Sequence, residues 1–153
     1  MGVTKDYLRF LPSTKCNAIA GVNCNIVFVK CNDDIKRTRY IAAGAAEDII
    51  IWDCKLSKKV RLIEGDKHEC RSLASNWESN RLAAGYRDGT VELYDSSSGE
   101  HLGTFSGHSS PVSALTFDND GHRLASGSMD TEVVVWDVIA EQGVFVILIF
   151  APV

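Results

Sequence analysis

Three side chains of the kinds that form a serine hydrolase triad, Ser126, His108 and Asp130, lie close together in the sequence. Such a triad needs an exposed nucleophile, a base within hydrogen-bonding reach, and donors that hold the developing oxyanion. Ser126 has no G-x-S-x-G elbow around it and stands between Ala125 and Gly127 in a strand-like stretch. The pattern therefore favours a structural role for these side chains, and we predict that the chain is not an enzyme.

No other stretch has the residue pattern of a cofactor or metal site. The phosphate-binding motifs G-x-G-x-x-G and G-x-x-x-x-G-K-[ST] and the zinc motif H-E-x-x-H are absent from the sequence. The run Asp118-Asn119-Asp120-Gly121 lacks the alternating ligands and distal glutamate of a calcium loop, and it predicts a turn. The histidines have no metal spacing, so we expect neither metal nor cofactor.

The five cysteines are odd in number and never form a C-x-x-C pair. A zinc site usually contains such pairs, and a secreted disulfide framework usually has an even number of cysteines. We therefore expect the thiols to be small buried hydrophobic groups in a reducing compartment. They are Cys16, Cys24, Cys31, Cys54 and Cys70.

Length and charge restrict the class of protein. The 153 residues favour one domain, and the 45% apolar and 24% charged residues are typical of a soluble globular protein. Sixteen Lys and Arg against 20 Asp and Glu leave a net charge of −4, whereas a domain that grips nucleic-acid phosphates is usually basic. Two basic clusters, 36–39 and 55–61, are interpreted as solvated loops beside a strand. Direct contact with nucleic acid is therefore a secondary hypothesis.

A repeat of 42 residues runs through the chain. The aromatic-Asp pairs Trp52-Asp53, Tyr94-Asp95 and Trp136-Asp137 follow one another at that interval, and Gly65 and Gly107 have the same spacing. Each pair closes a short apolar stretch that is preceded by a second extended stretch rich in small residues. Repeats of this length indicate supersecondary units that bury their faces against neighbouring units.

Each unit divides into four extended segments separated by turn residues. Asp, Asn and Gly in runs such as Arg87–Gly89 tolerate the positive φ of tight hairpins, and no stretch has sustained helical periodicity. The predicted strands are 25–30, 39–45, 49–53 and 60–64, then 70–75, 81–86, 91–95 and 101–105, then 112–117, 123–128, 133–137 and 144 onward. Four strands in about 42 residues are typical of one blade of a β-propeller.

The third unit resembles the signature of the WD-repeat β-propeller family, because 27 residues separate Gly107-His108 from Trp136-Asp137. The resemblance covers residues 25 to about 143 and implies an all-β fold, a partial propeller of about three four-stranded antiparallel blades. It also implies a structural network in which Trp136 donates to Ser126, Ser126 to His108 and His108 to Asp130. Each link of such a chain would contribute about 0.5–1.5 kcal/mol.

The first two units depart from this pattern. At the serine, histidine and tryptophan positions the second unit has Ala84, Asp66 and Tyr94. The first unit keeps Trp52 but has Ala43 in place of the serine. We therefore expect these two blades to depend more on apolar packing, and the loss of His108 to cost more than the loss of Asp66.

The pattern also predicts where the units begin and end. The predicted segments are N-terminal strands within 1–24, blade 1 at 25–65, blade 2 at 66–107, blade 3 at 108–143 and an apolar tail at 144–153. Because propellers have four to eight blades, we expect the repeat series to be interrupted near Val144, as in a truncated product. The eight apolar residues from Val144 to Ala151 could also form an outer strand or a self-association surface.

Residues 1–10, Asn25–Val29 and Leu124–Ile139 are similar to the start of a more specific group. That group is the nucleolar tandem-propeller family of WD-repeat components of the small-subunit processome. The resemblance implies a non-catalytic scaffold in small-subunit ribosome biogenesis and 18S pre-rRNA processing, located in the nucleolus of the nucleus. It implies other WD-repeat processome subunits as partners, with small nucleolar ribonucleoprotein and pre-rRNA reached indirectly and no membrane.

The alternative is a generic WD-repeat adaptor such as a ubiquitin-ligase substrate receptor. Those receptors often have arginine two positions after the Trp-Asp pair, where this chain has Lys55, Ser97 and Ile139. In either case the residues that precede the turn aspartates, Arg87 and Met129, are the predicted partner contacts on the top surface.

Overall fold

The structure is a computed structural model that describes residues 21, 23–31, 39–65, 68–140 and 142–148. Within these ranges the chain forms twelve β-strands and no helix, and therefore no helix long and apolar enough to cross a membrane. The strands build three four-stranded antiparallel sheets, each made of four consecutive strands. The fold class predicted from the repeat, three four-stranded blades, is confirmed.

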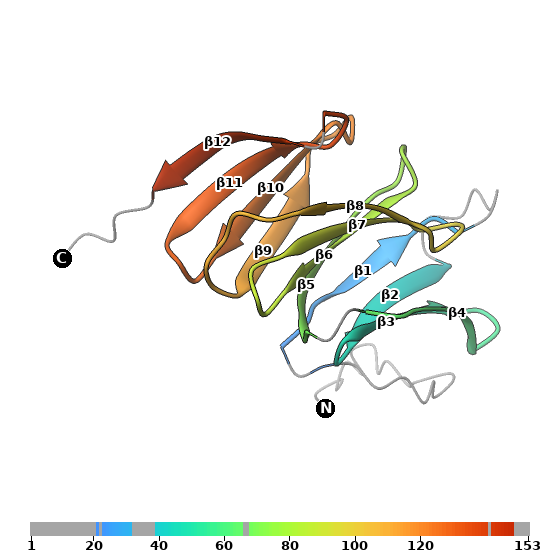
Figure 1. The fold of residues 1–153 in the computed structure, drawn as a ribbon. Helices are drawn as coiled ribbons and strands as arrows, with labels where there is room; N and C mark the ends of the chain where they lie inside the picture. The colour runs from blue at the N-terminus through green and yellow to red at the C-terminus, as the bar shows by residue number, and fades with distance from the viewer. Residues whose placement is uncertain (1–20, 22, 32–38, 66–67, 141, 149–153) are drawn as a thin grey trace, which may run out of the picture.

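The three sheets follow one another along the chain and fan out side by side (Figure 1). The first contains β1 (Ile26–Val29), β2 (Tyr40–Ala45), β3 (Asp48–Asp53) and β4 (Lys58–Ile63). The second contains β5 (Cys70–Asn76), β6 (Arg81–Tyr86), β7 (Val91–Asp95) and β8 (His101–Phe105). The third contains β9 (Val112–Phe117), β10 (Arg123–Ser128), β11 (Glu132–Asp137) and β12 (Gln142–Leu148).

The repeated aromatic residues occupy equivalent places in the three sheets. In each sheet the pairing of the third strand with the fourth shifts by one residue immediately before the aromatic residue, at Trp52, Tyr94 or Trp136. Such a bulge re-aims the side chain that follows it. The 42-residue spacing in the sequence therefore corresponds to one repeated backbone geometry.

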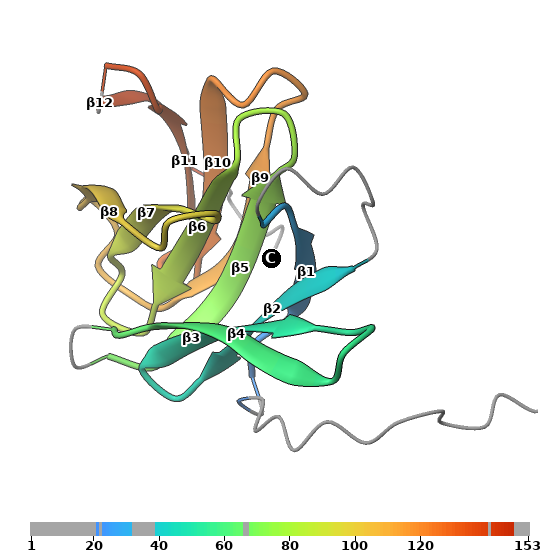
Figure 2. The same cartoon turned by 90° about the vertical axis from the view of Figure 1, so that its right-hand side faces the viewer.

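The first strands of the sheets, β1, β5 and β9, form the inner side of the fan (Figure 2), with β5 in contact with both of the others. Two side chains fasten β1 to β5. The Asn25 side chain accepts from the Leu73 N–H at 2.7 Å and donates to the Leu73 carbonyl at 2.9 Å, as a neighbouring strand would. Ser75 Oγ donates to the Phe28 carbonyl at 2.6 Å.

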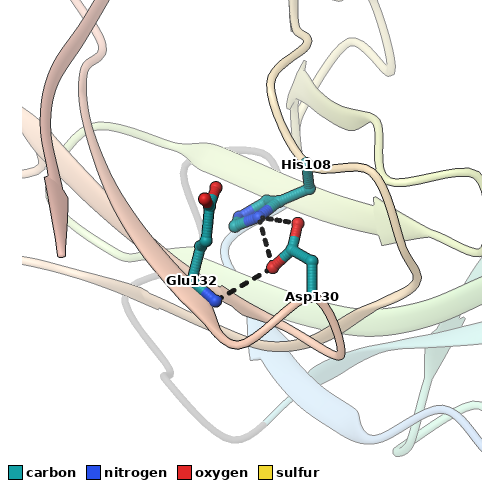
Figure 3. Close-up of side chains that lie close together, drawn as sticks. All are labelled: His108, Asp130 and Glu132. Atoms are coloured by element: carbon teal, nitrogen blue, oxygen red, sulfur yellow. Dashed lines mark hydrogen bonds and ion pairs between the residues drawn. The ribbon is translucent and has the colours of Figure 1, made fainter. Parts of the chain in front are cut away.

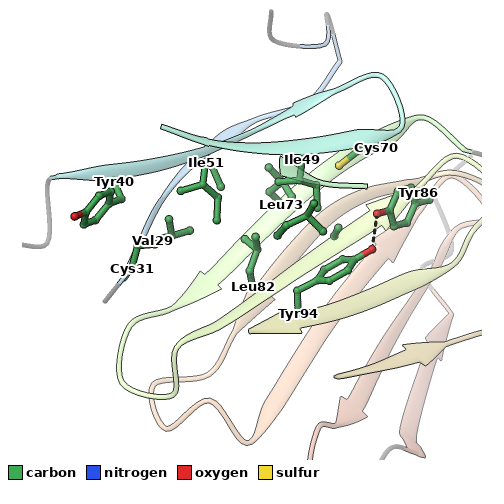
Figure 4. Packing of buried hydrophobic residues seen from close by; sticks show 13 residues of the cluster. Val29, Cys31, Tyr40, Ile49, Ile51, Cys70, Leu73, Leu82, Tyr86 and Tyr94 are labelled. Atoms are coloured by element: carbon green, nitrogen blue, oxygen red, sulfur yellow. Dashed lines mark hydrogen bonds between the residues drawn. The ribbon is translucent and has the colours of Figure 1, made fainter. Parts of the chain in front are cut away.

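Apolar side chains fill the space between neighbouring sheets. Figure 4 shows the first of two clusters, in which Ile49 and Ile51 of the first sheet meet Leu73 and Leu82 of the second. The second cluster, between the second and third sheets, contains Leu93, Phe105, Val112, Leu124, Val134 and Trp136. Fully burying one such side chain contributes about 1.5–3 kcal/mol, so sheet-to-sheet packing is the main source of stability.

The two outer faces of the fan are apolar as well. On the first sheet, Ile26 and Phe28 are each more than half exposed. On the third sheet, Phe145 and Ile147 are more than half exposed and pair with Val135 and Val133. Within the described residues neither face has a further sheet against it.

The fourth strand predicted from residue 144 onward corresponds to β12, so part of the stretch also assigned to an apolar tail, 144–153, belongs to the third blade. Gln142–Leu148 is β12, which pairs with β11 from Asp137 to Glu132, so the third blade extends at least to Leu148. The sequence could not separate this strand from an apolar tail, because residues 144–148 lack the polar alternation that is the usual signal of an outer strand. The strands expected within residues 1–20 lie outside the described residues.

Candidate functional site

The third sheet brings together the four side chains singled out in the sequence. Ser126 lies on β10, Trp136 on β11, Asp130 in the turn between them and His108 in the connection from β8 to β9. Trp136 Nε1 donates to Ser126 Oγ at 2.8 Å, and Ser126 Oγ is 2.7 Å from His108 Nε2. His108 Nδ1 is 3.0 Å from Asp130 Oδ2 (Figure 3).

The direction of these hydrogen bonds follows from the chemistry of their ends. Tryptophan can only donate, and an ionised aspartate can only accept. His108 therefore donates from Nδ1 to Asp130, and Ser126 Oγ accepts from Trp136 while it shares a further hydrogen bond with His108 Nε2. Every polar atom along the chain has a partner, which is the condition for a stable buried network.

Burial argues against nucleophilic chemistry at this place. Ser126 is 1% exposed, and its oxygen already accepts from Trp136 while facing His108. An acyl-transfer nucleophile must reach a substrate carbonyl, with oxyanion donors about 3 Å from the reacting oxygen. Ser126, His108 and Asp130 match a triad in residue type but offer no accessible nucleophile. Together with Trp136 they form a hydrogen-bonded network between strands, which is called the brace below.

Asp130 anchors the network to the backbone. Its carboxylate accepts from the Ser109 N–H at 2.9 Å and from the Glu132 N–H at 3.0 Å, in addition to His108. Burial acts to raise the pKa of this carboxyl, but the two backbone donors and His108 outweigh it and lower the pKa below its ordinary value. Asp130 is therefore charged at neutral pH and ties the β10–β11 turn to the connection that carries His108.

One cluster near this network has metal-ligating groups. His108, Asp130 and Glu132 each present an atom within 4.8 Å of the others (Figure 3). Both ring nitrogens of His108 are already used by Ser126 and Asp130. A bound cation would have to displace one of these bonds, so the cluster is better explained as part of the brace.

Sequence reasoning missed the role of the aspartate in each aromatic-Asp pair. Asp137 Oδ1 accepts from the backbone N–H groups of Ile139 and Ala140, both at 2.9 Å. Asp53 and Asp95 make the same pair of bonds in their own sheets. These bonds lower the pKa of Asp137 and close the turn that leads into the fourth strand. The recurrence of the aspartate every 42 residues was the sequence signal that could have indicated this role.

The second sheet has a different polar network. The Tyr94 hydroxyl lies 3.1 Å from the Tyr86 hydroxyl and donates to the Glu92 carboxylate. Burial raises the pKa of both tyrosines, so both stay protonated. The expectation that this blade relies on apolar packing therefore needs correction, because tyrosine supplies its own hydrogen bonds. Asp66 lies outside the described residues, and His68 instead approaches Asp88 at 3.7 Å.

The first sheet lacks the hydrogen-bond network of the third sheet. Trp52 occupies the place of Trp136, but its Nε1 is buried and has no hydrogen-bond partner among the residues that the structure describes. Ala43 lies on β2 opposite Ile50, as Ser126 lies on β10 opposite Val134, and it offers no acceptor. An unpaired buried donor costs about 1–3 kcal/mol, which this sheet tolerates.

We expect Ala43→Ser to stabilise the chain by about 1 kcal/mol, because its hydroxyl would accept from Trp52 Nε1. Urea unfolding monitored by tryptophan fluorescence measures the change. The matched control is Ala42→Ser on the same strand, whose side chain faces the apolar cluster. That variant should lose about 1–3 kcal/mol, because its hydroxyl finds no partner. Equal effects of the two substitutions would contradict the register-based assignment.

The two predicted partner contacts lie in equivalent turns. Arg87, in the β6–β7 turn, is exposed and forms a long ion pair with Glu69 at 3.9 Å. Met129, in the β10–β11 turn, is 68% exposed and borders a shallow pocket of about 150 Å³ that also touches Arg71 and Pro111. Both turns join the second strand of a sheet to the third, so they share one end of the fan.

The fold and the brace together define a WD40-repeat protein. The family "WD domain, G-beta repeat" matches residues 99–137, and the family "Anaphase-promoting complex subunit 4 WD40 domain" matches residues 40–117, half of the chain. The chain therefore belongs to the WD40-repeat family.

Among individual proteins, the chain is similar to mouse "WD repeat-containing protein 3", with 41% identity over 94 residues, 61% of this chain and 10% of that protein. It is 32% identical over 141 residues to "U3 small nucleolar RNA-associated protein 12" of Saccharomyces cerevisiae, covering 82% of this chain and 15% of that protein. The solved "Structure of U3-55K" superposes with a TM-score of 0.72 at 28% identity, over 82% of this chain and 38% of that one. The chain thus spans only a small part of each relative.

Proposed function

We propose that this chain belongs to a non-catalytic scaffold that assembles proteins during small-subunit ribosome biogenesis, as part of the small-subunit processome in the nucleolus. The observation that carries the proposal is the similarity to yeast U3 small nucleolar RNA-associated protein 12, which extends over 82% of the chain. The name of that relative states an association with the U3 small nucleolar RNA. The similarity of the fold to that of the U3-55K structure supports the same proposal.

The physical character of the chain agrees with protein contacts more than with RNA contacts. The net charge of −4 gives no general attraction for phosphates. Sheets that pack against one another through buried apolar clusters present their turns on a rigid base, which limits the conformational entropy lost when a partner binds. Pre-rRNA and small nucleolar ribonucleoprotein are therefore reached through other WD-repeat subunits.

The partner contacts on this chain are Arg87 and Met129. An exposed methionine beside a shallow pocket adapts to an apolar partner group, and the exposed arginine of the β6–β7 turn adds a charged contact of the kind that is enriched in interfaces. Both lie in turns at the same end of the fan. A partner that binds this end would touch the second and third sheets together.

Affinity purification of the tagged chain from nucleolar extract, with U3 RNA measured by hybridisation, tests the proposal. We expect U3 RNA to be enriched, and the double variant Arg87→Glu, Met129→Glu to reduce this enrichment about ten-fold without lowering the thermal unfolding midpoint. Leu56→Glu is the matched control, because Leu56 is exposed in the β3–β4 turn at the opposite end of the fan. Absence of U3 RNA from the purified wild-type complex would refute the processome assignment.

A second candidate function is a generic WD-repeat adaptor for a ubiquitin ligase. The match of residues 40–117 to the anaphase-promoting complex subunit 4 family is the observation that favours it. The positions where such receptors have arginine are here Lys55, Ser97 and Ile139, which weakens this candidate. Recovery of ubiquitin-ligase subunits in place of U3 RNA in the same purification would select it.

A further inference from the structure

Two cysteines that are far apart in the sequence meet at the seam between the first and second sheets. Cys24 precedes β1, and Cys70 is the first residue of β5. Their Sγ atoms lie 3.7 Å apart although 46 positions separate them in the chain. Backbone hydrogen bonds fix the position of the two cysteines at this seam. The Cys70 N–H donates to the Ala46 carbonyl at 2.7 Å, and the Gly21 N–H donates to the Gly44 carbonyl at 2.6 Å.

Gly44 on β2 provides the space for the two sulfur atoms. A Cβ at this position would lie 2.7 Å from Cys24 Sγ and 3.1 Å from Cys70 Sγ. Real Cβ atoms do not approach a sulfur so closely, so the thiol pair fills the volume that a side chain would take. The glycine therefore allows both thiols to face each other across the seam.

The two thiols differ in exposure and in acidity. Cys24 is half-buried, whereas Cys70 is 2% exposed. The hydrogen bond with Cys70 lowers the pKa of the Cys24 thiol, and the same bond together with burial raises the pKa of Cys70. Cys24 is thus the more accessible and more acidic thiol and Cys70 the less acidic thiol behind it, which is the order that a reacting and a resolving cysteine need.

We propose that Cys24 and Cys70 form a modification site that a hydroperoxide oxidises to an intramolecular disulfide. The Cys24 thiolate attacks one oxygen of hydrogen peroxide and becomes a sulfenic acid, while the O–O bond breaks and the second oxygen leaves as water after taking a proton. Cys70 then attacks the Cys24 sulfur, the S–O bond breaks, and the leaving hydroxide takes the proton of the Cys70 thiol and departs as a second water. Two thiols and one peroxide thereby give one disulfide and two waters.

The disulfide would fasten the whole first sheet to the second. The loop that it closes, from Cys24 to Cys70, contains β1, β2, β3 and β4. Closing a loop of this length restricts the unfolded chain and so stabilises the folded one. A reductant would reverse the change, so the stability of the first sheet would depend on the redox state of its surroundings.

Peptide mapping of the peroxide-treated chain tests the proposal. A Cys16→Ser background is used because Cys16 and Cys24 share the tryptic peptide 16–30, whereas Cys70 lies in the peptide 68–71. We expect a disulfide-linked 16–30/68–71 pair about ten-fold more abundant than any other linked pair. We also expect a thermal midpoint about 5 °C higher, which a thiol reductant reverses.

Three variants make the result decisive. Cys24→Ser and Cys70→Ser must each abolish the linked pair and the rise in midpoint. Cys54→Ser, which removes an exposed thiol in the β3–β4 turn, must keep both. The proposal fails if the folded chain yields Cys24 and Cys70 as free thiols while Cys54 is oxidised, or if the linked pair forms equally well in denaturant.

Discussion

Replacing His108 with alanine is expected to lower the free energy of unfolding by about 3–4 kcal/mol. The His108 side chain is fully buried, and its two ring nitrogens serve Ser126 and Asp130. Alanine would remove one hydrogen bond from the Ser126 hydroxyl and one from the Asp130 carboxylate, and each hydrogen bond lost by a buried group costs about 1–3 kcal/mol. The cavity left by the ring adds to this loss.

Urea unfolding followed by circular dichroism measures this loss. His122→Ala is the matched control, because His122 is exposed in the β9–β10 turn and its removal should change stability by less than about 0.5 kcal/mol. The network also predicts coupling: Ser126→Ala in the His108→Ala background should cost less than it does in the wild type. Fully additive losses would show that the two side chains do not act as one network.

The strands of the second and third sheets were largely predictable because turn residues and the aromatic-Asp pairs mark their ends. The predicted 81–86, 91–95 and 101–105 coincide with β6, β7 and β8. In the first sheet β4 begins at Lys58, two residues before the predicted start, because two lysines on an exposed outer strand look like a loop. Lysine on an outer strand is in fact a common defence against unwanted pairing.

The residues of the brace were predictable because the third unit resembles the WD-repeat signature, and that resemblance implies the network. Other features depend on what two sheets do to each other. The bond between the Tyr86 and Tyr94 hydroxyls requires the observed register of β6 and β7. The meeting of Cys24 and Cys70 requires the close approach at Gly44, which no local pattern of residues announces. Contacts between sheets could therefore not be predicted from the sequence.

Gly89→Ala is expected to destabilise the chain by about 3 kcal/mol, because two costs add. Gly89, in the β6–β7 turn, has a φ of 94°, a conformation that costs a residue with a Cβ about 1–2 kcal/mol. The new Cβ would also lie 2.4 Å from the His108 carbonyl oxygen and 3.1 Å from that of Ser110. Relieving such overlap by moving backbone costs about 1–3 kcal/mol.

Gly127→Ala separates this effect from the general consequence of removing a glycine. Gly127 lies on β10, and a Cβ there would approach nothing closer than 3.9 Å, so we expect a change within about 0.5 kcal/mol. Thermal unfolding of both variants provides the comparison. Because Gly89 packs against the backbone of His108, Gly89→Ala should also cost less in the His108→Ala background, where the connection is already loosened. If the two glycine variants are equally stable, the turn of the second sheet does not support the brace of the third.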